Sequence, residues 1–76
     1  MSKLTIISDK EMIKLIARLG FKEIRQNGSH KFFADLEGRC TVIPAHNKDL
    51  KRGLIKGILK DIGITDDEYE KLREKL

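Results

Sequence analysis

The spacing of apolar residues near the N-terminus predicts a first helix. Its apolar positions lie three or four residues apart and are Met12, Ile13, Leu15, Ile16 and Leu19. The segment before them, Ser8-Asp9-Lys10-Glu11, is a capping-box sequence, in which Ser8 accepts from the Glu11 N–H and the Glu11 side chain reaches back to Ser8. Gly20 stands where a glycine commonly ends a helix. The pattern therefore predicts a helix over roughly residues 9–19.

The next three segments have the residue types of strands. They are residues 21–26, 30–36 and 39–44, separated by Asn27-Gly28 and Glu37-Gly38. An Asn-Gly pair favours a type I′ hairpin because both residues tolerate a positive φ angle. Pro44 ends the third segment because proline cannot donate to a strand ladder. We expect three antiparallel strands, with His30 at the start of the second strand.

A second amphipathic helix follows. Its apolar positions recur every four residues at Leu50, Leu54, Ile58 and Ile62, with Ile55 and Leu59 beside them. This spacing predicts a helix over residues 50–62 that ends at Gly63 and carries Arg52, Lys56 and Lys60 on its opposite face. Gly53 and Gly57 inside the helix each cost about 1 kcal/mol relative to alanine. We expect them where the sheet or a ligand approaches the backbone closely, and tight packing on the sheet is the simpler interpretation.

The remaining residues predict a short third helix. Thr65-Asp66-Asp67-Glu68 is another capping-box sequence, and Tyr69, Leu72 and Leu76 supply its apolar side. The chain is then an α+β domain over residues 1–76, with a helix, three antiparallel strands, a helix and a short terminal helix. Both main helices must cover the same sheet face, because a three-stranded sheet needs one face buried. This α-β-β-β-α order resembles the double-stranded-RNA-binding fold, which by itself implies binding rather than chemistry.

The charge balance favours a polyanionic partner. The 76 residues carry a formal net charge of +4, from 16 basic and 12 acidic side chains. Residues 1–64 hold 13 basic and 7 acidic side chains, whereas residues 65–76 hold 3 and 5. A basic body attracts nucleic acid or an acidic protein. The alternative is a charged helix face that serves only solubility.

Other features of the composition bear on location and cofactors. No apolar run reaches the length of about 18 residues that suggests a membrane helix, and the first residues do not form a signal peptide, so we expect no membrane association. Cys40 is the single cysteine, which fits a reducing cytoplasm, and its place in a strand predicts a small buried side chain. Two histidines, one cysteine and no clustered carboxylates give little support to a metal site, and we expect no cofactor.

The candidate chemistry lies in Gly28-Ser29-His30-Lys31. Histidine can take or give a proton near neutral pH, although spacing alone favours a structural turn histidine at position 30. Ser29 fits a turn or a strand start better than a nucleophile, because no base with an orienting group adjoins it in the sequence. His46 has three open roles: a second proton carrier, a contact to RNA, or a cap for the second helix.

Four segments of the chain match the pattern of one family. They are Leu19-Gly20-Phe21, Gly28-Ser29-His30, Val42-Ile43-Pro44-Ala45-His46 and residues 50–64, which run from Leu-Lys-x-Gly through Ile-Leu-Lys to Gly-Ile. With these four segments, the chain resembles the HicA family of toxin ribonucleases from bacterial toxin–antitoxin pairs over about residues 8–65. It departs from the common pattern at Leu54, Ile55 and Gly57, and the acidic segment after Thr65 is longer than in many members.

The resemblance implies an endoribonuclease that cleaves mRNA without a metal and inhibits translation, with His30 as its catalytic acid or base. The chemistry is available because the 2′-hydroxyl of RNA attacks the adjacent phosphorus once its proton is removed. We expect contacts to RNA from Gly28, Ser29, Lys31, His46, Lys48, Lys51, Arg52 and Lys56. Phe32 and Phe33 are candidates for stacking on bases, and we expect at least one of them in the core.

The resemblance also implies partners. A HicB-type antitoxin would cover the active site and join the toxin in repressing their shared promoter, so that DNA is met only through that complex. Two other hypotheses stay open: a non-catalytic RNA-binding module of the same fold, and an interaction protein whose basic face serves an acidic partner. Cleavage products from labelled RNA would separate the nuclease from both.

Overall fold

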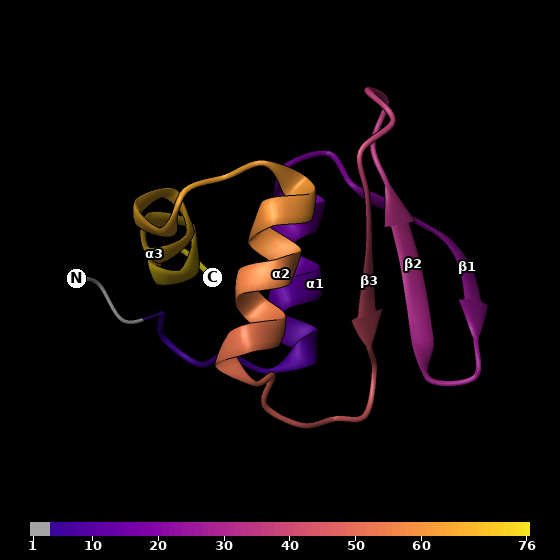
Figure 1. Ribbon diagram of the computed structural model, residues 1–76, viewed down its shortest axis with the longest axis horizontal. Coiled ribbons are helices and arrows are strands. Elements are labelled where there is room, and N and C mark those ends of the chain that lie inside the picture. The colour runs from indigo at the N-terminus through magenta and orange to yellow at the C-terminus, as the bar shows by residue number, and fades with distance from the viewer. Residues whose placement is uncertain (1–3) are drawn as a thin grey trace.

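The computed structural model describes residues 4–76 and has the element order that the sequence predicts. Its elements are α1 (Asp9–Arg18), β1 (Lys22–Asn27), β2 (His30–Ala34), β3 (Cys40–Pro44), α2 (Arg52–Ile62) and α3 (Asp66–Glu74). The strands form one antiparallel sheet in the order β1-β2-β3. Figure 1 shows α1 and α2 on one side of the sheet, where both contact β3, and α3 beyond them. The predicted α+β fold of the double-stranded-RNA-binding type is confirmed.

Capping groups set the ends of the helices. Ser8 Oγ accepts from the Glu11 N–H, and the Glu11 carboxylate accepts from the Ser8 N–H, so the predicted capping box of α1 is confirmed. The hydrogen bonds from Ser8 lower the pKa of Glu11. Gly63 ends α2 with a φ angle of +76°, which glycine adopts without strain. α3 begins with a second confirmed capping box, at Thr65.

Alternation along the strands decides which side chains face the helices. Phe33, Thr41 and Ile43 are buried against the helices, and Phe33 lies opposite Thr41 in the β2–β3 ladder. Because successive side chains of a strand point to opposite faces, His30 and Phe32 lie on the other face of the sheet. No helix within residues 4–76 covers that second face (Figure 1). The sheet therefore presents His30 on its uncovered side.

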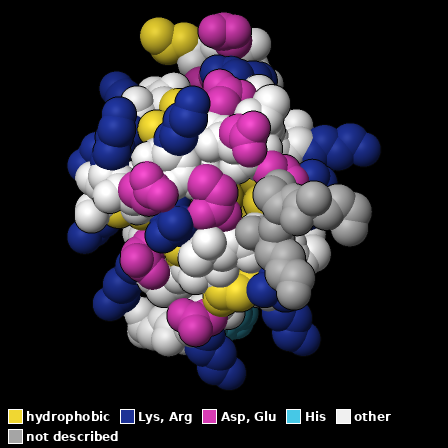
Figure 2. Space-filling model, turned by 90° about the vertical axis from the view of Figure 1, so that its left-hand side faces the viewer, with side chains coloured by type: hydrophobic (Ala, Val, Ile, Leu, Met, Phe, Trp, Pro, Cys, Tyr) yellow, Lys and Arg dark blue, Asp and Glu magenta, His cyan; other side chains and the backbone are white. Residues whose placement is uncertain are grey.

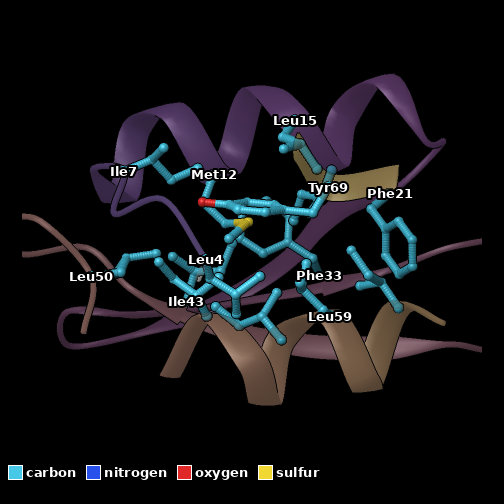
Figure 3. Packing of buried hydrophobic residues seen from close by; sticks show 14 residues of the cluster. Leu4, Ile7, Met12, Leu15, Phe21, Phe33, Ile43, Leu50, Leu59 and Tyr69 are labelled. Carbon is cyan, nitrogen blue, oxygen red and sulfur yellow. The ribbon is translucent and has the colours of Figure 1, made fainter. Parts of the chain in front are cut away.

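A cluster of 14 buried apolar side chains fills the space between the helices and the sheet (Figure 3). α2 contributes Ile55, Ile58, Leu59 and Ile62. The predicted apolar side of this segment is therefore buried, Leu50 included, except at Leu54, which is 37% exposed. The helix also begins two residues later than predicted, because Leu50 donates its N–H to the Ile7 carbonyl in an extended segment.

Three further predictions about local structure are wrong. Cys40 is exposed, because it lies on the uncovered side of β3, one residue before the inward-facing Thr41. Gly53 and Gly57 are not packed against the sheet, since a Cβ atom at either position would meet nothing within 4 Å. The first hairpin is not type I′: its two-residue loop is Gly28-Ser29, and Gly28 alone has a positive φ angle, +63°. This sign pattern is that of a type II′ turn, because Asn27 stays in the strand and pairs with His30.

The third helix is joined to the rest of the fold by a buried aromatic ring. Tyr69 is fully buried in the core, and its hydroxyl donates a hydrogen bond to the Thr5 carbonyl. The Glu70 carboxylate accepts from both the N–H and the hydroxyl of Thr5, at 2.9 Å each. These bonds from Thr5 lower the pKa of Glu70. Helix α3 therefore holds the segment that precedes α1.

Candidate active site

The first hairpin turn is fixed against the connection that follows β3. The Ala45 N–H donates to the Ser29 carbonyl at 2.6 Å, and the Gln26 side-chain amide donates to the Gly28 carbonyl at 2.8 Å. His30 is the first residue of β2 and pairs with Asn27 on one side and Pro44 on the other. Its backbone is therefore held by both neighbouring strands, while its side chain is exposed.

A second histidine lies beside the turn. The ring centroids of His30 and His46 are 6.4 Å apart, with an angle of 80° between the ring planes. His46 Nε2 is 3.3 Å from the Ser29 hydroxyl, within hydrogen-bond distance. Both rings are exposed to solvent. The structure thus brings together Ser29, His30 and His46 from two separate segments of the chain.

The loop that carries His46 rests on the N-terminus of α1. Asp9 is 2% exposed, and its carboxylate accepts from the Asn47 N–H at 3.1 Å. The Asp9 N–H donates to the Lys48 carbonyl, also at 3.1 Å. Asn47 has a φ angle of +58°, a left-handed conformation that asparagine tolerates better than most residues. These contacts fix the backbone of Asn47, the residue that follows His46.

Two lysines line a small hollow with His46. The hollow has a volume of about 210 Å³ and is bounded by Pro44, His46, Lys48, Asp49, Leu50, Lys51 and Leu54. Lys48 and Lys51 are exposed, so their ammonium groups can reach an anion placed beside the His46 ring. The arrangement offers two proton-exchanging rings and two cationic groups at one end of the sheet.

Three other predicted contact residues make bonds within the chain. Lys31 lies 3.8 Å from Glu23 and, by alternation, is on the opposite sheet face from His30. Arg52 Nε donates to the Leu4 carbonyl at 3.0 Å. Lys56 Nζ donates to the Asp66 carboxylate at 2.8 Å, on the side of α2 that faces α3. The structure does not place these three cations beside the two histidines.

The two candidate stacking residues divide between the core and the surface. Phe33 is buried, whereas Phe32 lies on the uncovered sheet face, two residues after His30. The guanidinium of Arg25 lies over the Phe32 ring at 4.1 Å from its centroid. Sequence reasoning did not single out Arg25. The signal available for it was its place on β1, whose ladder with β2 sets Arg25 opposite Phe32.

A larger hollow lies elsewhere and contains neither histidine. Its volume is about 690 Å³, and its lining includes Gly53, Gly57 and Lys60 of α2 together with Thr65 and Asp66 at the start of α3. The glycines open this side of α2 because they carry no side chain. The smaller hollow is the one that His46 lines, and the His30 ring lies 6.4 Å from the His46 ring between centroids.

Two features are absent from residues 4–76. No three His, Cys, Asp or Glu side chains in this range lie close enough together to bind a metal ion. Within the same residues, no helix has the length and apolar character of a membrane span.

Comparison with known proteins identifies one family. The family model of the HicA toxin of bacterial toxin–antitoxin systems matches residues 10–64. This segment runs from the first turn of α1 to Ile64, two residues after the end of α2, and it includes both histidines. No curated protein matches the chain.

Proposed function

Because this chain belongs to the HicA toxin family of bacterial toxin–antitoxin systems, we propose that it is a metal-independent endoribonuclease that cleaves mRNA and so inhibits translation. The observation that carries the proposal is the exposed His30 ring, held at a hairpin turn 6.4 Å from a second imidazole. A solvent-exposed imidazole on a rigid backbone can approach a phosphodiester and exchange a proton with it. RNA supplies the nucleophile itself, as its 2′-hydroxyl.

His30 acts as a general acid or base in this reaction. Removal of the 2′-hydroxyl proton lets that oxygen attack the adjacent phosphorus, and the bond to the 5′-oxygen of the next nucleotide breaks. The products are a 2′,3′-cyclic phosphate and a free 5′-hydroxyl. One well-placed acid or base contributes about 10²–10⁴-fold to such a step. DNA lacks the 2′-hydroxyl and is therefore not a substrate.

Cationic groups at the same end of the molecule support binding of the RNA backbone. Figure 2 shows the α3 side of the protein, where acidic side chains lie across the middle. Lys and Arg side chains lie around the rim of this view, and part of a histidine is visible at its lower end. Lys48 and Lys51 line the hollow beside His46 and would hold the phosphate next to the scissile bond.

The uncovered sheet face offers a surface for a neighbouring base. Phe32 lies on the same face as His30, and Arg25 covers its ring. A base of single-stranded RNA can stack on such an aromatic and guanidinium surface without strong sequence preference. We therefore place the RNA strand across the uncovered sheet face, from Phe32 past His30 to the hollow beside His46.

Family membership supports an antitoxin partner. We propose that this partner is of the HicB type and that it inhibits cleavage by covering His30 and His46, which protrude at one end of the sheet. Contact with DNA would then occur only in the toxin–antitoxin complex. The protein would act in the cytoplasm, where its mRNA substrate is translated.

The proposal is tested with purified protein and end-labelled single-stranded RNA in the presence of EDTA. We expect fragments with 2′,3′-cyclic phosphate and 5′-hydroxyl ends, and no cleavage of DNA of the same sequence. A matched RNA with one 2′-deoxynucleotide at a mapped cleavage site should resist cleavage there. Binding without fragments would instead identify an RNA-binding module. A protein that neither binds nor cleaves RNA at low salt would contradict both the nuclease and the RNA-binding hypotheses.

The lysines give a second prediction, on affinity. Replacing Lys48 or Lys51 with alanine should weaken binding severalfold to the RNA that carries a 2′-deoxynucleotide at the cleavage site. The slope of the logarithm of the binding constant against the logarithm of the salt concentration should become shallower by about 0.7 for each lost phosphate contact. Lys56→Ala should have a smaller effect, because its ammonium already pairs with Asp66. Filter binding between low and moderate salt measures both quantities. Lys14→Ala, which removes an exposed charge from α1, is the control. An effect of Lys56→Ala as large as that of Lys51→Ala would contradict the assigned binding surface.

A further inference from the structure

We propose that His46 is a second catalytic residue, which divides the two proton transfers of RNA cleavage with His30. This inference rests on the proposed ribonuclease function and extends it from one imidazole to a pair. The observations behind it are the separation of the two rings and the hydrogen-bond partner of His46. The fixed loop that carries His46 is a third and independent observation.

The separation of the rings suits a phosphodiester placed between them. At 6.4 Å between centroids, the two imidazoles are too far apart to hydrogen-bond to each other. In an in-line displacement, the attacking 2′-oxygen and the leaving 5′-oxygen lie on opposite sides of the phosphorus. Two groups that serve these oxygens must therefore stand apart, each within about 2.6–3.2 Å of its own oxygen. His30 begins β2 and His46 follows β3, and the 6.4 Å between their ring centroids leaves the two imidazoles apart in this way.

The contact with the Ser29 hydroxyl occupies Nε2 of His46, so in this proposal Nδ1 exchanges the proton. The hydroxyl oxygen lies 3.3 Å from Nε2 and can accept a hydrogen bond from an Nε2–H group. This contact orients the ring and leaves Nδ1 to face the substrate. It also persists in both charge states, because Nε2 carries a hydrogen in the cation and in this neutral tautomer. Ser29 is thus a positioning residue for His46.

The surroundings of His46 combine charges of both signs. His30 faces it from β2, and Lys48, Asp49 and Lys51 share its hollow. The buried Asp9 carboxylate, at the start of α1, accepts a hydrogen bond from the Asn47 N–H and not from the His46 ring. Lys48 and Lys51 can bind the phosphate oxygens that do not react. His46 is then left to serve one of the two reacting oxygens.

The two proton transfers require one neutral and one protonated imidazole. One imidazole, neutral at the start, takes the proton of the 2′-hydroxyl as the new O–P bond forms. The other imidazole, protonated at the start, gives its proton to the 5′-oxygen as the old P–O bond breaks. The pair ends with its charges exchanged, and no further reactant is needed. Each transfer requires one specific protonation state, so the rate should fall at both low and high pH.

The experiment compares the pH profile of single-turnover cleavage for the wild type, His46→Ala and the Lys14→Ala control, on the same labelled RNA. We expect a bell-shaped profile for the wild type and the control. His46→Ala should lose about 10²–10³-fold in rate and one limb of the profile. Its affinity for the RNA blocked by 2′-deoxy substitution should change by less than threefold. Added imidazole should restore part of the lost rate.

A second measurement uses the unmodified protein. An RNA whose scissile 5′-oxygen is replaced by sulfur needs no proton on its leaving group, so the wild type should lose one limb of the profile with this substrate. The same substrate should restore activity to only one of His30→Ala and His46→Ala, which identifies the acid. A His46→Ala protein with the wild-type rate and both limbs, or one with only weaker RNA binding, would overturn the inference. An inactive wild type would instead overturn the ribonuclease proposal itself.

Discussion

Replacing His30 with alanine is expected to reduce RNA cleavage by about 10²–10⁴-fold, the usual contribution of a positioned acid or base. The side chain is exposed, and its backbone pairs with Asn27 and Pro44 do not depend on the imidazole. The free energy of unfolding should therefore change by no more than about 0.5 kcal/mol. Single-turnover cleavage measures the first effect, and urea denaturation measures the second.

The controls for His30→Ala separate chemistry from binding. The variant should still bind RNA that carries a blocking 2′-deoxynucleotide, because Lys48 and Lys51 remain beside the hollow. Induced in cells, the wild type should arrest growth and His30→Ala should not. Undiminished cleavage by the folded variant would remove His30 from the mechanism. Loss of binding together with cleavage would make it a contact residue rather than a catalytic one.

The elements of this fold follow from local sequence signals. Ser8 and Thr65 each precede a glutamate by three residues, and each forms the capping box that such spacing predicts. Gly63 provides a left-handed residue at the end of α2. These signals depend on neighbours within one turn of helix, so a single sequence is enough to detect them.

Side-chain environment was harder to predict, because it depends on which face a neighbouring element covers. Cys40 alternates correctly along its strand, but the sequence does not say which of the two sheet faces the helices cover. The choice between Leu54 and Ile55 as the buried residue required the orientation of α2 against β3. Gly53 and Gly57 were expected at a packed surface and instead face an open hollow.

The site shows the same division between local and long-range information. The prediction for His30 rests on the family resemblance at Gly28-Ser29-His30, a motif that is contiguous in the chain. The contact between Ser29 and His46 joins residues 17 positions apart. It depends on the ladder register that sets His30 opposite Pro44, two residues before His46. Asp9 was read only as part of a capping box, and nothing in its local sequence indicated that it holds the His46 loop.

Tyr69→Ala is expected to be the most damaging substitution outside the site. The ring is fully buried and belongs to the same core cluster as Met12 (Figure 3). Its removal should lower the free energy of unfolding by about 3–5 kcal/mol, as for other large aromatic residues in cores. A small domain has only about 5–15 kcal/mol in total, so much of the protein would unfold at moderate temperature. Helix α3 lies outside the residues matched by the family model, yet the core depends on it.

Two variants make this prediction specific. Tyr69→Phe keeps the ring and removes only the hydroxyl that donates to the Thr5 carbonyl, so it should cost about 1–2 kcal/mol. Leu36→Ala is the control, because Leu36 is fully exposed and its loss should change stability by no more than about 0.5 kcal/mol. Urea denaturation gives the free energy of unfolding of Tyr69→Ala, Tyr69→Phe and Leu36→Ala, and so the order of their stabilities. A Tyr69→Ala protein as stable as Leu36→Ala would show that α3 is not needed for the core.

The ionisation of Tyr69 provides an independent check on its burial. Burial, and secondly the charge of Glu70, raise the pKa of this phenol to about 12, from an ordinary value of 10.0. Because the folded-state pKa is raised, the contribution to stability is present below pH 10 and is lost as the pH rises towards 12. Lysines titrate in the same range, so the informative quantity is the stability of the wild type minus that of Tyr69→Phe. Tyr69 is the only tyrosine in the chain, and tyrosinate absorbance therefore reports its titration directly. A midpoint near 10 in the folded protein would mean that the hydroxyl is in contact with water and that α3 is not docked as described.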